Sequence, residues 1–123
     1  MTDTRSASEL AAVAAGAVRA LNRATLAVDG EAPGLTYPGD VYATVAALGA
    51  AAGELPQSFE QLLGFLDQLN AAGALRSERD ALGAELLEAG AALADAAQAA
   101  HALRGALDRA LPALGAVGHV QPA

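Results

Sequence analysis

The fold is decided by residues 40–72, DVYATVAALGAAAGELPQSFEQLLGFLDQLNAA. Apolar residues recur there at alternating steps of four and three, the repeat of one face of a packed helix. The repeat keeps its phase through Pro56, although an internal proline costs a helix on the order of 3 kcal/mol. We therefore predict one helix over residues 40–72, kinked at residues 53–56. The alternative is a break, with Pro56 in the first turn of a new helix. The repeating positions are Val41, Val45, Leu48, Ala52, Leu55, Phe59, Leu62, Leu66 and Leu69.

A second long repeat occupies residues 77–111, SERDALGAELLEAGAALADAAQAAHALRGALDRAL. The spacing of Ser77 and Asp80 resembles a capping box, and Pro112 is expected to end this helix. Gly73 is expected to end the preceding helix. Both helices have roughly 33 to 35 residues, about 50 Å at 1.5 Å per residue, and a short turn joins them. The sequence therefore predicts a long antiparallel helical hairpin.

The N-terminal third predicts one shorter helix, over residues 7–27. Ser6 or Ser8 is its N-cap, and Ser6 followed by Glu9 has capping-box spacing. Residues 28–39 contain five prolines and glycines and are expected to form a loop, whereas residues 112–123 are expected to form a flexible tail. We predict a single all-α domain over residues 1–123, a three- to four-helix bundle in which the N-terminal helix packs on the hairpin.

Composition supports helices and limits the possible partners. The chain has 35 Ala and 19 Leu but no Cys, Trp, Ile or Lys, and its formal net charge is −7. No basic residue lies between Arg23 and Arg76, so binding to nucleic acid or to an anionic membrane surface is not expected. The acidic middle is either a docking face for a basic partner or, as we favour, a solubilising surface. The absence of Cys and of a signal peptide favours a cytoplasmic protein.

No residue pattern predicts catalysis, a metal or a cofactor. Neither His101 nor His119 has a second ligand at helical spacing, and the Glu-x-x-His signature of di-metal helical bundles does not occur. Glu85 and Glu88 have the spacing of a carboxylate pair on one helix face, but a solvated surface with Arg79 nearby explains them better. We predict that the protein is not an enzyme.

The predicted function is protein–protein interaction. Alanine removes little area from water, so a monomeric core is thin and a homodimer is expected. Leu63 and Leu87 widen the apolar face beyond what one partner helix covers. Tyr37 and Tyr42 are candidate anchors for an unknown protein partner, although packing of the loop against the hairpin explains them better. The predicted interaction seam consists of Leu48, Leu55, Phe59, Leu62, Leu66, Leu82, Leu86, Leu93, Leu103 and Leu107.

Two resemblances accompany these patterns. The run Leu35-Thr36-Tyr37-Pro38-Gly39-Asp40-Val41-Tyr42, followed by Leu55-Pro56-Gln57 and Gln61-Leu62, resembles an uncharacterised family of small helical proteins from high-GC Gram-positive bacteria. That likeness covers roughly residues 35–114 and implies a bacterial source but no activity. Size, acidity and a helical hairpin also resemble the WXG100-type secreted proteins, although no Trp-x-Gly lies at the turn. This second likeness implies, as the alternative function, a secreted helical-hairpin protein.

Overall fold

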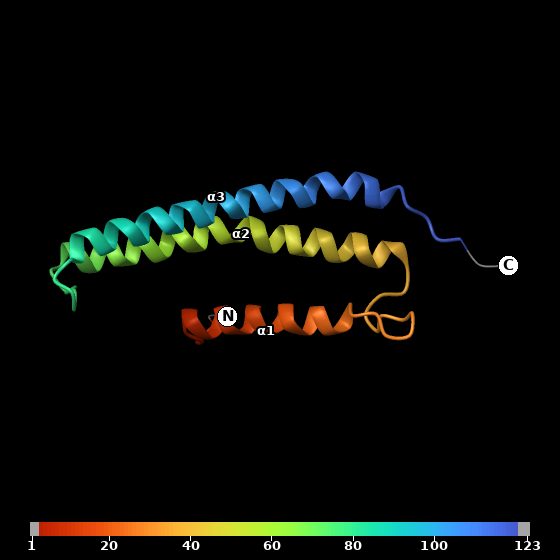
Figure 1. The fold of residues 1–123 in the computed structure, drawn as a ribbon, viewed down its shortest axis with the longest axis horizontal. Helices are drawn as coiled ribbons and strands as arrows, with labels where there is room; N and C mark the ends of the chain where they lie inside the picture. The colour runs from red at the N-terminus through yellow and green to blue at the C-terminus, as the bar shows by residue number, and fades with distance from the viewer. Residues whose placement is uncertain (1–2, 121–123) are drawn as a thin grey trace.

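The structure, a computed structural model, describes residues 3–120 and is all-α (Figure 1). Helix α1 spans Ala7–Ala24, α2 spans Pro38–Ala71 and α3 spans Leu82–Gly115. Helices α2 and α3 have 34 residues each and lie side by side as an antiparallel hairpin. Within residues 3–120 there is no β-strand, and the only β-type pairing is one isolated bridge. The predicted all-α fold with a long helical hairpin is confirmed.

Helix α1 begins with the cap expected from the sequence. The Ser6 Oγ accepts a hydrogen bond from the backbone N–H of Glu9 at 3.2 Å, so Ser6 rather than Ser8 is the N-cap. The helix ends at Ala24, three residues before the predicted end at Ala27. Thr25 is the C-cap, and its hydroxyl donates to the carbonyl of Leu21 at 2.9 Å. Such side-chain competition for a helix carbonyl is typical of a helix end.

The connection from α1 to α2 is an ordered loop. Val28 and Glu31 exchange two backbone hydrogen bonds around Asp29 and Gly30, whose φ angles are 54° and 80°. Two consecutive positive φ angles define a type I′ turn, for which Asp-Gly is a preferred pair. Farther on, the N–H of Gly34 donates to the carbonyl of Ala24 at 2.8 Å and ties the loop to the end of α1.

Helix α2 begins at Pro38, two residues before the predicted start at Asp40. Tyr37 is the N-cap and Pro38 occupies the first helical position, where its fixed φ suits a helix and its missing N–H costs nothing. Asp40 still caps the helix, but from the third helical position. Its carboxylate accepts the backbone N–H of Tyr37 at 2.8 Å and of Thr36 at 2.7 Å.

Helix α2 then runs without interruption through Pro56 to Ala71. This decides between the two alternatives left open by the sequence, because residues 38–71 form one helix and not two. The kink predicted at residues 53–56 is not confirmed. At the end of α2, Gly73 has a φ of 71°, its N–H donates to Asn70, and the N–H of Ala74 donates to Leu69. This is a Schellman motif, and it confirms that Gly73 ends the helix.

Helix α3 begins at Leu82, five residues later than the predicted start at Ser77. Ser77 caps a turn instead of the helix, because its hydroxyl accepts the backbone N–H groups of Arg79 and Ala81, both at 3.1 Å. Asp80 has a positive φ of 54°, which is incompatible with a right-handed helix through this segment. Asparagine and aspartate adopt this conformation more readily than other non-glycine residues.

Helix α3 also ends later than predicted, because Pro112 lies inside it and the helix continues to Gly115. Pro112 removes the hydrogen bond to the carbonyl of Asp108. Both residues are exposed, so water can satisfy that carbonyl. The predicted tail over residues 112–123 is therefore helical at its start, and its last three residues lie outside the described part.

The most buried residues between the two long helices have small side chains or are proline. Ala52 and Ala100 are 3% and 6% exposed, and Gly49 and Pro56 are also buried. Small side chains bring helix axes together, because the interaxial distance depends on the residues at the contact. Larger residues on either side are only half-buried, among them Leu48, Phe59, Leu66, Leu86, Leu93 and Leu107. The hairpin therefore has a thin core.

Helix α1 runs alongside the hairpin but does not pack tightly on it. No Cα atom of α1 lies within 8 Å of a Cα atom of α2 or α3 across these three described helices. None of its residues is buried, although its apolar residues fall on one stripe. Figure 1 shows α1 separated from α2 and ending partway along the hairpin. The close packing of the N-terminal helix on the hairpin that we predicted is therefore not present within this chain.

Candidate interaction surface

The predicted seam residues divide into two groups. Seven of them are half-buried between the long helices: Leu48, Phe59, Leu66, Leu82, Leu86, Leu93 and Leu107. The other three, Leu55, Leu62 and Leu103, are 41%, 49% and 50% exposed. Pro56 and Leu63 occupy the places in the α2–α3 contact that the sequence pattern assigns to Leu55 and Leu62.

Arg104 covers one flank of the hairpin. A Cβ atom added to Gly49 would lie 3.7 Å from Arg104 Cδ, and one added to Gly53 would overlap the Arg104 guanidinium. The arginine side chain therefore crosses the two glycines, and its Nε donates to the Asp108 carboxylate at 3.2 Å. The spacing Gly49-x-x-x-Gly53 serves here to admit a long side chain from the neighbouring helix.

The exposed leucines lie on the opposite flank. Successive helix residues are rotated by about 100°, so Leu103 in α3 points away from the flank that Arg104 covers. In α2, Leu55 is rotated by about 200° from Gly53, which lies under Arg104, so Leu55 also points away from that flank. Leu62 follows Leu55 by seven residues, about two turns, and Phe65, 59% exposed, is three residues farther along. We call Leu55, Leu62, Phe65 and Leu103 the leucine flank.

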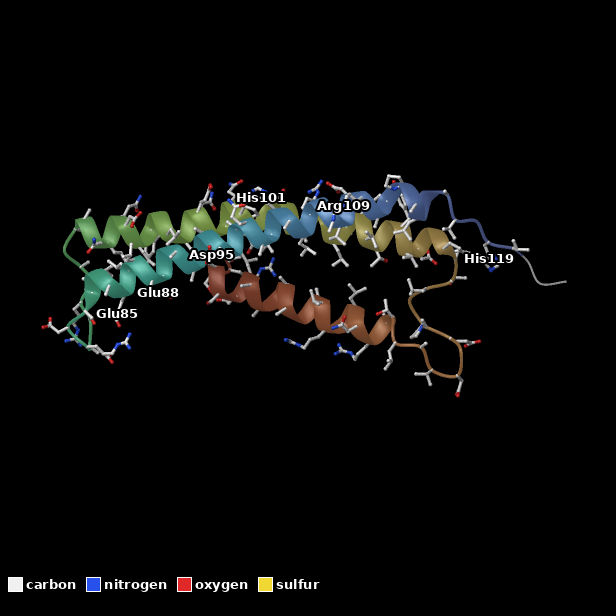
Figure 2. The ribbon with its side chains drawn as sticks, turned by 45° about the horizontal axis from the view of Figure 1, so that its top comes forward. Glu85, Glu88, Asp95, His101, Arg109 and His119 are labelled. Atoms are coloured by element: carbon white, nitrogen blue, oxygen red, sulfur yellow. The ribbon has the colours of Figure 1, made fainter. Side chains whose placement is uncertain are left out.

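A shallow open groove continues the leucine flank toward the turn between α2 and α3. Its floor consists of the small residues Ala81, Ala84, Ala89 and Ala92, with Glu85 and Glu88 at its edge and Arg79 at one end. Ala92 precedes Leu103 by 11 residues, close to three helical turns, and therefore lies on the same flank. In Figure 2, Glu85, Glu88 and Asp95 follow one edge of α3, and His101 and Arg109 lie on another side.

The charged groups at this groove differ in how they are satisfied. Arg79 donates to Glu85 from Nε at 3.0 Å and from Nη2 at 2.5 Å. The Ser77 hydroxyl and then the Arg79 guanidinium hold the pKa of Glu85 below its ordinary value. Glu88 and Asp95, in contrast, have no ion-pair partner among residues 3–120. The edge of the groove therefore presents unneutralised negative charge.

The two tyrosines lie at the other end of the hairpin and contact its C-terminal segment. Tyr37 and His119 stack edge to face, with ring centroids 5.5 Å apart and ring planes at 82°. Tyr42 lies over Gly115, where an added Cβ atom would be 3.4 Å from the tyrosine ring. Both tyrosines remain partly exposed. These contacts favour the alternative that Tyr37 and Tyr42 pack the loop and the tail against the hairpin.

Metal-ligand groups and helices that could span a membrane are both absent from residues 3–120. Residues 3–120 contain no group of three or more His, Asp or Glu side chains placed to hold a metal ion. His101 is exposed on the surface of α3. Among these residues, no helix has both the length and the apolar character needed to cross a bilayer. Comparison with known proteins found no matching family model, no matching curated protein and no matching solved structure.

Proposed function

We propose that this chain is a non-enzymatic helical interaction protein of the cytoplasm that forms a homodimer and, as a dimer, serves as a scaffold for another protein. The observation that carries the proposal is the leucine flank. Four large apolar side chains are exposed on one side of a two-helix hairpin, and exposed apolar surface of this kind marks protein–protein contacts when it is contiguous.

The thin core supports self-association. Only Ala52 and Ala100 are buried hydrophobic residues within residues 3–120, and alanine burial contributes little hydrophobic free energy. Small domains that lack disulfides and metals commonly gain stability by oligomerisation. No catalytic step belongs to this proposal, because the one carboxylate pair considered, Glu85 with Glu88, has Glu85 held by Arg79.

Light scattering coupled to size-exclusion chromatography tests the proposal. We expect a mass of twice the chain's 12.1 kDa. Leu62→Asp places a charge on the leucine flank without entering the α2–α3 contact, so it is expected to give a folded monomer. Leu87→Asp is the matched control, because Leu87 is 77% exposed and lies on another side of α3. A wild-type mass of one chain at every concentration contradicts the proposal.

The second candidate function is that of a secreted WXG100-type protein. The observation in its favour is the hairpin of two equal 34-residue helices joined at Gly73 by a ten-residue connection. Accumulation of the protein in the medium of a strain that carries its native secretion genes, together with loss of export when those genes are deleted, supports this candidate. Retention of the protein in the cells under the same conditions favours the cytoplasmic scaffold.

A further inference from the structure

We infer that, in the homodimer on which the proposed function rests, α1 of each copy lies in the groove and on the turn-end half of the leucine flank of the other copy. The dimer is thus a reciprocal exchange of N-terminal helices. The inference rests on four observations: the one-sided character of α1, its separation from its own hairpin, its reach and its charge.

Helix α1 is built to bury one side. Leu10, Ala14, Ala17 and Leu21 follow one another at steps of four, three and four, and Val13 is three residues from Leu10 and four from Ala17, so all five lie on a single stripe. Leu10 is 40% exposed and Val13 is 53% exposed. In proteins most of the stability of a helix comes from packing of its amphipathic face, so this stripe needs an apolar surface to cover it.

The chain's own hairpin does not provide that surface, because the ordered loop holds α1 away from it. The Val28–Glu31 bridge and the hydrogen bond from Gly34 to Ala24 fix the loop at the end of α1. The Asp40 carboxylate fixes the other end through Tyr37 and Thr36. Packed helices lie about 8–10 Å apart, axis to axis, and since each Cα atom lies about 2.3 Å from its helix axis, the facing Cα atoms of packed helices come within 8 Å of each other. No Cα atom of α1 comes that close to one in α2 or α3, so α1 is not packed on its own hairpin.

Reach leads to the same result. Helix α1 runs back from the loop over about 27 Å, and α2 extends about 51 Å, at 1.5 Å per residue. Helix α1 is therefore about half as long as α2, and Figure 1 shows its N-terminal end partway along the hairpin, short of the turn between α2 and α3. Leu62, Phe65 and the alanine groove lie beyond that point, toward Gly73. Only a helix from another molecule can cover them.

The charges of α1 and of the groove are complementary. Helix α1 carries Arg19 and Arg23 against the single acid Glu9, and neither arginine has an ion-pair partner among the described residues. The groove edge carries the unpaired Glu88, and the unpaired Asp95 lies beyond the groove along the same edge of α3. Arg19 and Arg23 lie on the side of α1 opposite the apolar stripe, so in the docked helix they face solvent and form no contact with the groove. The excess of basic residues on α1 favours its long-range approach to this acidic edge over that of an acidic helix.

The buried area requires that the exchange be reciprocal. One α1 about 27 Å long and about 10 Å wide covers on the order of 300 Å² of the partner hairpin. Counting both surfaces and both copies gives on the order of 1,000 Å², close to the lower bound of about 1,200 Å² for stable interfaces. A one-sided contact has only half this area. A two-fold symmetric dimer, in which each copy donates its α1 and receives the α1 of the other, forms both contacts and leaves no unpaired α1 or groove for a third copy.

Cysteine cross-linking tests the inference, since the native chain has no cysteine. Ala17→Cys lies on the apolar stripe of α1 and Ala92→Cys lies in the groove. Full-length chains with one change each are mixed and treated with a bismaleimide. We expect a covalent dimer that contains one chain of each kind. In the matched control, Ala94→Cys replaces Ala92→Cys, because Ala94 is also exposed but lies on another side of α3. We expect no such product from the control mixture.

The double variant, with both Ala17→Cys and Ala92→Cys in one chain, separates the possible outcomes. Cross-linking between two chains supports the exchange. A cross-link within one chain means that α1 docks on its own hairpin and overturns the inference. No cross-link, combined with a mass of two chains by light scattering, also overturns the inference but leaves the homodimer of the proposed function intact. A mass of one chain overturns both.

Discussion

The closest approach of α2 and α3 makes a sharp prediction about Ala52. Ala52 and Ala100 are 3% and 6% exposed, so each lies in the α2–α3 contact with little free space around it. Ala52→Leu inserts three additional carbon atoms there and forces the helix axes apart. Inserting extra carbon atoms into a packed core costs about 1–3 kcal/mol. For a chain of this size, each 1 kcal/mol lowers Tm by about 4 °C, so the expected decrease is about 4–12 °C.

Thermal unfolding followed by circular dichroism measures this decrease. Ala50→Leu is the matched control, because Ala50 is exposed two residues away in the same helix and its replacement adds the same atoms. We expect the control to change Tm by less than about 2 °C, as surface substitutions usually do. Equal Tm values for the two variants would show that Ala52 does not face α3, and the reasoning about the thin core would then be wrong.

Three further predictions concern single residues. Gly73→Ala forces an L-residue into the left-handed conformation at a φ of 71°, and is expected to lower the free energy of unfolding by about 1 kcal/mol in urea titration; an unchanged midpoint would contradict the Schellman end of α2. Leu93→Asp places a charge between the long helices and is expected to destabilise the hairpin by at least about 2 kcal/mol, and a stability like that of wild type would show that Leu93 has no partner. The backbone N–H groups of Tyr37 and then Thr36 lower the pKa of Asp40, so its contribution to stability is present above the unfolded-state pKa of about 3.9 and is lost as pH falls through the lower folded-state pKa. The difference in Tm between wild type and Asp40→Asn is therefore expected at pH 7 and should shrink as pH falls below that range, whereas a difference that is constant with pH would contradict this role of Asp40.

The elements that the sequence predicts well are those with a local chemical signal. Ser6 with Glu9 predicted the N-cap of α1, and Gly73 predicted the end of α2, because each depends on hydrogen bonds within a few residues. The start of α3 was predicted five residues early for a related reason. Ser77 makes the local hydrogen bonds of a cap, but Asp80 has a left-handed backbone conformation, so these bonds close a turn and do not start a helix. The spacing of residues in the sequence carries no information on that φ angle.

The surface was harder to predict because the rotation of a helix about its axis depends on its partner. A repeat of four and three places Leu55 and Leu62 at the contact, whereas the structure has Pro56 and Leu63 there. The rotation lets Gly49 and Pro56 face α3, which shortens the distance between the axes and moves the leucine row outside. The separation of α1 from the hairpin could not be predicted from the sequence pattern either. An amphipathic stripe indicates that a helix packs against a partner, but not which molecule provides that partner.

The ordered loop that keeps α1 away from the hairpin has a consequence for amide hydrogen exchange. Without contacts to α2 and α3, α1 can open by itself, and its amides exchange through local unfolding that leaves the hairpin intact. In the exchanged dimer those amides gain protection from the partner, so their exchange rates fall as protein concentration rises. The amides of α2 near Ala52 lack this dependence on concentration, since a contact within the chain already protects them.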